Sequence, residues 1–539
     1  MKRFTVLFVV LVSIAGLIFA APSDESASAS GKVILSAVAT QPPWITSIEN
    51  NRLTELIEET LDFEFDFTII PLEGAKQQIN LLLTSGQYPS VFMNAPFVPA
   101  DELEFGAEGG VLISLNDYIT REKTPNLLNA FAEYPKLRDE ITAPDGNIYV
   151  IAGGGSGGCY HCSIYQKFWI NQAWLDNLGL DIPETPVEYR EVLRAFKNQD
   201  PNQNGKMDEV PLTGAVSGWY PNPAYFIGQA FVPYAAAGSG TKLFGVDGNK
   251  VYFPYSDTRW RDALAFMHAL HEEGLLDPNA YVQNGDQLAG LGGSSSDPKD
   301  IVIGSFPGGG PMIGFGSGNE RAEDYSPLPP LSGPTGIKTT AGYPFGTRRL
   351  GGEAGTFSIT DKASAAEIEK GMAIMNWAFS FEGSMHVASG ANLWRKAERG
   401  DLNLFGEQAS VVALERPGTG DVKWEFPVYL SFPGEGEGFG FQGGIPVLEQ
   451  TLMLSTRDVY EPFKDAMGIT MLSDFIYMDT EDARRVAQVS AELRTFVEQN
   501  IALFITGQRD LDRDWNSYVN ELDRIGLAEI TDILNDNLK

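Results

Sequence analysis

One short stretch of the sequence carries oxygen-bearing side chains at the spacing that hard cations require. It reads DPNQNGKMDE from Asp200 to Glu209, with such side chains at its first, third, fifth and ninth positions and glycine at the sixth. The glycine permits a sharp turn, and the seventh residue offers its backbone carbonyl. The pattern predicts a calcium site with the ligands Asp200, Asn202, Asn204, Lys206, Asp208 and Glu209.

This stretch departs from an EF-hand at its end. The twelfth position, where an EF-hand has a bidentate glutamate, is Pro211, so Glu209 must take that role. Pro211 also blocks the helix that follows an EF-hand loop. The alternative is an Asn/Asp/Gly turn without metal. If calcium binds, we expect a structural ion, because protein oxygens fill its coordination shell and leave little room for substrate.

The only two cysteines, Cys159 and Cys162, form a CxxC pair. In an exported protein the default expectation is a structural disulfide. A thioredoxin-like dithiol needs its first cysteine at a helix start, whereas the following residues, SIYQKFWI, have an extended pattern. A zinc site would need two more ligands, and neither a second CxxC nor a paired histidine lies nearby.

No catalytic residue is predicted. The glycine run 153–158 formally matches both the GxSxG and the GxGxxG patterns, but each requires a helix directly afterwards, and none is predicted there. His268 and His271 lie on one amphipathic pattern without a carboxylate at metalloprotease spacing. We therefore expect a binding protein and not an enzyme, although the many acidic residues leave a pair of sugar-hydrolysing carboxylates open.

Aromatic residues in polar stretches favour sugar binding. Sugar rings have apolar C–H faces and hydroxyl rims, which suit an aromatic ring beside hydrogen-bonding groups. Trp44 and Asn94 follow strand-like runs, and ligands of parallel sheets bind at the carboxyl ends of strands. The alternative for each ring is packing in a core. The predicted ligand contacts are Trp44, Asn94, Trp219, Tyr220, Phe345, Trp394 and Arg395.

Arg395 bears on the charge of the ligand. A guanidinium in so acidic a chain hints at an acidic sugar, because the rest of the protein would repel a carboxylate. The alternative is that Arg395 pairs with a neighbouring acid such as Glu398.

The elements that must position these residues alternate along the chain. Strand-like runs at Lys32–Val38, Phe65–Ile70 and Val91–Met93 are separated by helical patterns at Asn51–Leu61 and Ala75–Thr84. This β-α-β-α-β order predicts a parallel sheet covered by helices. Further helices are predicted over about 172–178, 186–197, 257–274, 363–381 and most of 482–539, and a further strand over 301–306.

Length and charge limit the class of protein. The 539 residues suggest two or more lobes, and a hydrophobic content of 43% supports sizeable cores. There are 39 Lys and Arg against 71 Asp and Glu, which gives a formal net charge of −32. We therefore expect no nucleic-acid partner and no binding to an anionic membrane surface, because both would repel the chain.

The first twenty residues have the pattern of a signal peptide. Lys2 and Arg3 precede an uncharged, mostly apolar run that ends at the small residues Ala20 and Ala21. Residues 21–31, rich in Ser and Ala, predict a flexible linker. No cysteine lies near the cut, which disfavours a lipoprotein. The expectation is a periplasmic or extracellular protein, and the alternative is an uncleaved N-terminal anchor.

Several stretches, in their order and spacing, resemble the extracellular solute-binding proteins of family 1, which serve ABC sugar importers. The resemblance runs from about Lys32 to Leu538 and includes the calcium-like loop. It is to the long subgroup with a calcium loop, whose members include binders of oligosaccharides, some of them containing uronates. The stretches that carry it are Leu82–Phe92, Val111–Asp117, Asp145–Val150, Phe168–Pro211, Glu273–Pro278, Ser380–Gly390 and Asn500–Asp512.

The resemblance implies a two-lobe α/β fold of the periplasmic-binding-protein type, type II-like, with hinge crossovers and a ligand cleft between the lobes. Residues 32–152 plus 345–395 would form the first lobe, and 153–344 plus 396–539 the second. The implied function is to bind a carbohydrate, an oligosaccharide for this subgroup, and to deliver it to an ABC transporter permease as a monomer.

The chain also departs from the family pattern. The lipobox cysteine is missing, the CxxC is extra, and the region 290–342 is long and rich in Gly and Ser. The first departure leaves membrane attachment open, and the other two leave the substrate open. The alternatives are an exported carbohydrate-active enzyme and a peptide- or metal-binding receptor on the same fold.

Overall fold

The computed structural model describes most of the chain from residue 31 to residue 538. The predicted signal peptide, Trp44, Cys159, Cys162 and Phe345 lie outside the described residues. Among the helices that are described, none combines the length and the apolar character needed to cross a membrane. The described residues are 31–42, 45–133, 135–155, 164, 166–236, 240–293, 295–316, 319–341, 356–403, 406–414, 420–424, 427, 429–430, 439–441, 455–473 and 476–538.

The N-terminal part of the chain builds a five-stranded sheet in the order β2-β1-β3-β11-β4. β1 (Val33–Gln41) pairs in parallel with β2 (Phe63–Pro71) and with β3 (Val91–Ala95), which confirms the predicted alternation. β11 (Thr356–Ile359) comes from much later in the chain and runs antiparallel between β3 and β4 (Ile151–Ala152). Sequence patterns did not predict this insertion, because it depends on a pairing over a long distance.

Both faces of this sheet are buried. Ala37 and Ala39 of β1 belong to one apolar cluster, whereas Val38 between them belongs to another. Successive side chains of a strand point to opposite faces, so helices must cover both. The helical elements of this part of the chain are α1 (Arg52–Leu61), α2 (Ala75–Ser85), α3 (Pro99–Asp101), the π-helix η1 (Glu102–Glu108), α4 (Pro125–Glu133), α5 (Pro135–Glu140), α14 (Ala365–Ala378) and α15 (Phe381–Ser389).

Local signals place the ends of these helices. The side chain of Asn51 accepts a hydrogen bond from the backbone N–H of Leu53 and caps α1. α2 ends at Gly86, which has a φ of 73°, a conformation that favours glycine. The helix predicted over 363–381 is α14, which ends at Ala378, and Ser380 caps the start of the next helix, α15, with its side chain.

The second lobe contains a sheet in which β6 (Phe168–Asn171) lies between β10 (Tyr325–Pro327) and β9 (Ser305–Pro307), all antiparallel. The predicted strand over 301–306 is therefore only partly correct, since β9 starts at Ser305. The other strands are β7 (Gly245–Asp247), β8 (Lys250–Tyr252) and β16 (Ile469–Met471). The helices are α7 (Gln172–Leu178), α8 (Pro186–Asn198), α9 (Pro223–Gly228), α10 (Thr258–Glu272), α11 (Gly285–Gly292), α12 (Met312–Phe315), α18 (Thr480–Ile505), α19 (Leu511–Ile525) and α20 (Leu527–Asn537).

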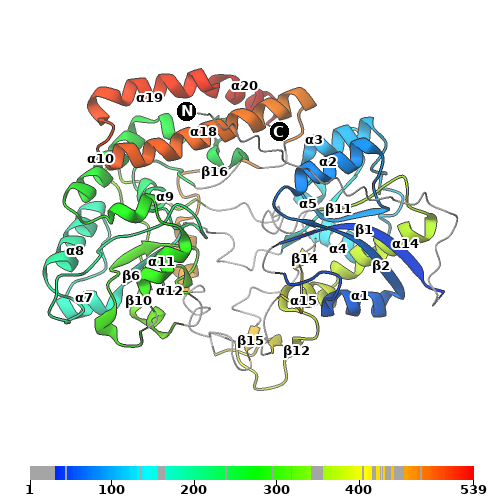
Figure 1. Ribbon diagram of the computed structural model, residues 1–539, viewed down its shortest axis with the longest axis horizontal. Coiled ribbons are helices and arrows are strands. Elements are labelled where there is room, and N and C mark those ends of the chain that lie inside the picture. The colour runs from blue at the N-terminus through cyan, green and yellow to red at the C-terminus, as the bar shows by residue number, and fades with distance from the viewer. Residues whose placement is uncertain are drawn as a thin grey trace, which may run out of the picture.

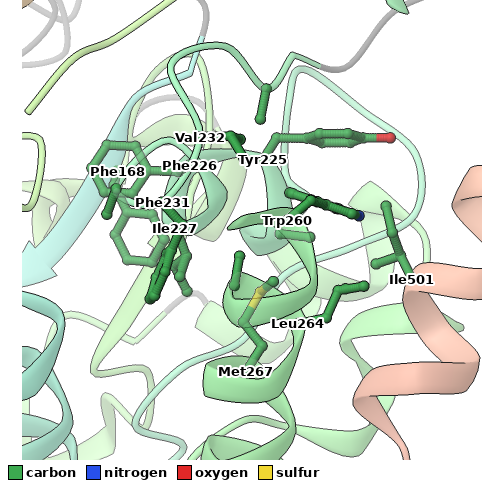
Figure 2. Packing of buried hydrophobic residues seen from close by; sticks show 14 of the residues in the cluster. Phe168, Tyr225, Phe226, Ile227, Phe231, Val232, Trp260, Leu264, Met267 and Ile501 are labelled. Atoms are coloured by element: carbon green, nitrogen blue, oxygen red, sulfur yellow. The ribbon is translucent and has the colours of Figure 1, made fainter. Parts of the chain in front are cut away.

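Large aromatic side chains fill the core of this lobe. Figure 2 shows Trp260 of α10 among Tyr225, Leu264 and Ile501, the last of which comes from α18. Gly228 at the end of α9 permits this packing, because a Cβ atom there would lie 2.4 Å from the Trp260 ring. The α18 helix is thus tied to residues more than two hundred positions earlier in the chain.

Two separate groups of buried residues divide the chain into two lobes (Figure 1). We call residues 31–152 and 356–424 lobe I, and residues 164–341 and 455–538 lobe II. The family resemblance implied that residues 396–539 belong to the second lobe, but Trp424 is fully buried in lobe I and donates a hydrogen bond to Thr54 Oγ1 at 2.9 Å. The chain therefore leaves lobe I later than expected.

A small sheet lies beside lobe I. β12 (Trp394–Lys396), β13 (Val411–Ala413) and β15 (Phe439–Phe441) form it, and β12 contacts α15. A separate pair, β14 (Tyr429–Leu430) and β5 (Gly154–Gly155), joins this part of the chain to the segment that follows β4.

Candidate ligand-binding site

The crossovers between the lobes identify the edge of the lobe I sheet that faces lobe II. The chain leaves lobe I after Ala152 and returns at Thr356, and these two residues pair with each other. Thr356 also pairs with Ala95, so the carboxyl end of β3 lies at the same edge. β1 runs parallel to β3, and its end at Gln41 therefore lies there as well. Sheets of this kind bind ligands at this edge.

Two buried polar side chains at this edge have unused hydrogen-bonding capacity. Asn94 is 2% exposed, and its Nδ2 donates to the carbonyl of Thr40 at 2.9 Å. Its Oδ1 and the fully buried Oγ1 of Thr40 have no hydrogen-bond partner in the structure as described. Asn94 also has a φ of 56°. Buried polar atoms without partners and left-handed residues inside strands are both uncommon and occur at functional sites.

The opposing edge of lobe II is located in the same way. The first crossover enters β6 at Phe168, which pairs with Pro307 at the end of β9. The glycines that follow β9 therefore lie at the edge that faces lobe I. The carbonyl of Trp219 accepts a hydrogen bond from the N–H of Gly309 at 2.9 Å. Trp219, predicted from its loop setting, is thereby placed at this edge.

The indole of Trp219 lies directly against glycine backbone. A Cβ atom on Gly309 would come within 2.3 Å of the ring, so only glycine allows this approach. The ammonium group of Lys167 lies 5.8 Å from the ring centroid, within the range of a cation–π interaction. Lys167 is itself fully buried, and its Nζ donates to the carbonyl of Ile164.

Gln166 is a further residue that the sequence did not single out. It is 2% exposed, and neither its Oε1 nor its Nε2 has a hydrogen-bond partner among the described residues. It directly precedes Lys167 on the crossover that leads into β6. A lone glutamine and a lone threonine carry no sequence signal of ligand binding, and only their burial without partners distinguishes Gln166 and Thr40.

The remaining predicted ligand contacts that lie among the described residues have partners inside the protein. Tyr220 packs against a small cluster that includes Tyr234 and Met471. The Nε1 of Trp394 donates to Nδ1 of His386 at 3.2 Å, and its ring meets the ring of Phe381 edge to face. Both rings thus have packing partners inside the protein, and both are half-buried.

Arg395 forms a bidentate pair within the small sheet. Its Nη1 and Nη2 donate to the two carboxylate oxygens of Asp401 at 2.6 and 3.0 Å. This pairing lowers the pKa of Asp401 to about 2. The sequence left open that Arg395 pairs with an acidic residue of the protein itself. It does so, but its partner is Asp401 and not the suggested Glu398. The Arg395 guanidinium already has its carboxylate, which removes the hint at an acidic sugar.

The calcium-like stretch forms a tight loop after α8. Its φ angles at Asp200, Gln203 and Gly205 are 47°, 57° and 80°. The carboxylate of Asp200 accepts from the backbone N–H groups of Asn204 and Gly205 at 3.1 and 3.0 Å. The Nδ2 of Asn204 donates to Asp208 Oδ1 at 3.0 Å. These bonds bring the first, fifth and ninth positions of the loop together.

Glu209 is the residue of this loop that lacks a partner. Both of its carboxylate oxygens are buried, and neither accepts a hydrogen bond from any residue that the structure describes. Burial raises the pKa of Glu209, and the negative charges of Asp200 and Asp208 raise it further, against the opposing effect of nearby backbone N–H groups. A calcium ion at this loop would compensate these charges.

The loop does not hold a metal site made of acidic and imidazole ligands alone. No group of three or more His, Cys, Asp or Glu side chains in the described ranges is arranged to bind a metal ion. The predicted ligand set draws two of its members from asparagine, and Asn202 donates its Nδ2 to the carbonyl of Ile301 at 2.9 Å, which leaves its Oδ1 on the loop side. The donor types fit calcium, which prefers mixed carboxylate and carbonyl oxygens.

Comparison with known proteins gives relatives over nearly the whole chain. No protein-family model matches. The chain is 26% identical over 520 residues to the fructooligosaccharide ABC transporter substrate-binding protein FusA of Streptococcus pneumoniae. The aligned region covers 92% of this chain and 88% of FusA. It is 28% identical over 318 residues to the polygalacturonan/rhamnogalacturonan-binding protein YtcQ of Bacillus subtilis. That aligned region covers 57% of this chain and 58% of YtcQ.

Solved structures show the same fold. A human-milk-oligosaccharide (HMO) binding, ABC-transporter-associated solute-binding protein of Bifidobacterium longum infantis has a TM-score of 0.74 at 23% identity, over 94% of this chain and 98% of that one. FusA in complex with kestose has a TM-score of 0.70 at 22% identity, over 93% of this chain and 98% of that one. The chain therefore has the two-lobe fold of the solute-binding proteins and, as its sequence stretches implied, is a relative of the sugar-binding proteins of ABC transporters.

Proposed function

We propose that this chain is the substrate-binding protein of an ABC importer, which binds an oligosaccharide between its lobes and delivers it to a membrane permease. The observation that carries this proposal is the relation to FusA, a fructooligosaccharide-binding protein, across almost the full length of both chains. The two facing edges, with an aromatic ring on one and unsatisfied polar groups on the other, support it.

In this proposal the two lobes contribute different chemistry to one ligand. The Trp219 ring on lobe II offers a face for the C–H side of a sugar ring. On lobe I, Asn94 Oδ1 accepts from a sugar hydroxyl, and the Thr40 hydroxyl donates or accepts. Gln166 on lobe II adds an amide that does both. These residues bind and orient the sugar, and no step in their role breaks a bond.

We also propose that the loop from Asp200 to Glu209 binds one calcium ion that stabilises lobe II. The buried, unpartnered carboxylate of Glu209 supports this, because an uncompensated buried charge is costly. A solved structure of an EF-hand mutant of FusA, in complex with fructo-nystose, has a TM-score of 0.69 to this chain. The ligands would be the six residues named from the sequence, with Lys206 contributing its carbonyl.

The proposal includes export of the protein. The N-terminal pattern of residues 1–20 supports a signal peptide, and the relatives are binding proteins of ABC transporters. The mature protein then works in the periplasm or outside the cell, as a monomer, where its permease partner receives the sugar.

Titration calorimetry against a panel of oligosaccharides tests the proposal. The panel holds neutral fructans, milk-type oligosaccharides and galacturonan fragments, so that both neutral and acidic ligands are covered. We expect binding of at least one of them, and Trp219→Ala should weaken it roughly three- to tenfold or more through lost stacking. Trp394→Phe serves as the matched aromatic control. Hydrolysis products during the titration would favour an enzyme, and no binding to any sugar would refute the proposal.

A further inference from the structure

A short segment before α18 contacts both lobes. Ile476 and Met478 belong to the core of lobe II, whereas Tyr477 between them packs against the lobe I cluster that contains Phe105 and Tyr149. Alternating side chains of an extended segment point in opposite directions, which explains how three successive residues reach two lobes. This contact is separate from the crossovers, because the chain is in lobe II before and after it.

A hydrogen bond fixes Tyr477 to lobe I. Its hydroxyl donates to Glu102 Oε2 at 2.7 Å, and Glu102 is fully buried. Such a bond to a carboxylate is stronger than one between neutral groups. The two residues are 375 positions apart in the sequence, so only the packing of the lobes brings them together.

The residues around Glu102 are packed and hydrogen-bonded within lobe I. The preceding residue, Asp101, accepts from the backbone N–H of Val98 at 2.7 Å and pairs with Lys76 of α2. Glu102 itself begins η1. π-helical turns are rare in proteins, and those that occur are often found at functional sites. A Cβ atom on Gly106 of η1 would lie 2.6 Å from the Tyr149 ring, so the turn lies directly on the lobe I cluster.

Lobe II holds Tyr477 through a long helix. α18 starts at Thr480, packs along α10, α19 and α20, and contacts α3 of lobe I. Figure 1 shows α18 in orange along the top of lobe II, with one end beside α3. A rotation of lobe II about any axis away from this contact would therefore move this helix end and strain the Tyr477–Glu102 bond.

We propose that Tyr477 and Glu102 form a non-covalent interlobe joint that fixes the angle between the lobes before a ligand binds. The joint itself does not depend on the proposed function; only its expected effect on sugar affinity does. With the joint intact, the two ligand-binding edges are already oriented. Without it, the ligand must order the lobes itself, and its apparent affinity falls.

Small-angle X-ray scattering of the ligand-free mature protein tests the joint directly. Tyr477→Phe removes one hydroxyl and keeps the ring. Tyr252→Phe is the matched control, because its hydroxyl also donates to a carboxylate, Asp257 Oδ2 at 3.1 Å, but within lobe II. We expect Tyr477→Phe to broaden the distribution of interatomic distances and Tyr252→Phe to leave it unchanged. Identical scattering from wild type and Tyr477→Phe would overturn the joint.

Affinity for an oligosaccharide gives a second readout. We expect Tyr477→Phe to raise the Kd roughly fivefold or more, a typical size for coupling between a remote contact and a binding site, with Tyr252→Phe unchanged. Glu102→Gln should raise the Kd similarly, and the double variant should add little to either single one. An unchanged Kd in Tyr477→Phe would contradict the consequence for affinity. If no sugar binds to the wild-type protein, the proposed function fails, while the scattering comparison still decides the joint.

Discussion

Replacing Glu209 with glutamine should have opposite effects on stability with and without calcium. In the calcium-free protein the carboxylate is buried, has no hydrogen-bond partner among the described residues, and is repelled by Asp200 and Asp208. Glutamine has nearly the same shape without the charge, so Glu209→Gln should stabilise the calcium-free form. In the calcium-loaded form the same change removes an anionic ligand and should destabilise it.

The magnitudes follow from the burial of the two oxygens. A buried group without a partner costs about 1–3 kcal/mol, and more when it is charged. Removing that charge should therefore raise the calcium-free melting temperature by about 2–12 °C, at roughly 2–4 °C per kcal/mol for a lobe of this size. Calcium at about 100 times its Kd adds about 2.7 kcal/mol to the wild type, which corresponds to a rise of about 5–10 °C.

Differential scanning calorimetry with chelator and with excess calcium measures all four melting temperatures. We expect wild type without calcium to melt at the lowest temperature. Wild type with calcium and the variant without calcium should both melt above it, and the variant should gain little from the ion. Asn198→Asp, outside the loop, is a control for charge near it. If wild type melts at the same temperature in chelator and calcium, and the purified protein holds no metal, the loop is an ordinary turn.

Other substitutions address the binding edges and the small sheet. Gly309→Ala should displace the Trp219 ring, since a Cβ there lies 2.3 Å from it, and weaken sugar binding about as much as Trp219→Ala; Gly290→Ala, with open space around it, should not. Thr40→Val replaces a buried hydroxyl without a partner in the described chain, so calorimetry should show an equal or higher melting temperature but a weaker sugar affinity. Burial lowers the pKa of His386, whose Nδ1 accepts from Trp394 Nε1 and from the N–H of Asn392. Because the unfolded chain then binds the proton more readily, stability should fall as the pH drops below about 6.5, and His386→Gln should lose this dependence.

Structure that depends on neighbours in the sequence could be predicted. Asn51 and Gly86 mark the ends of α1 and α2, and Thr185 with Glu188 forms the capping box that starts α8. The parallel sheet could be predicted in the same way, because each strand-like run and each helical pattern is a local feature, and their alternating order indicates a parallel sheet. The candidate calcium loop is equally local, because all of its ligands lie within ten residues.

Aromatic residues were harder to assign from sequence. Trp219 and Trp394 both lie in polar stretches, yet Trp219 lies against the glycines after β9, while the indole N–H of Trp394 is bound to His386. Their surroundings depend on which distant segments meet them. The same holds for Arg395, whose partner Asp401 could not be chosen among several nearby acids without the geometry of the small sheet.

The sequence by itself determined the order of strands and helices, the two-lobe family resemblance and the spacing of the calcium-like loop, because each depends on residues close together in the chain. Only the tertiary structure decided that β11 inserts between β3 and β4, that Thr40, Asn94 and Gln166 are buried without using all their hydrogen-bonding atoms, and that Tyr477 reaches Glu102. Burial and hydrogen-bond partners are properties of segments that meet in space. A sequence lists the groups that need partners, and the packing of the lobes determines which of them remain without one.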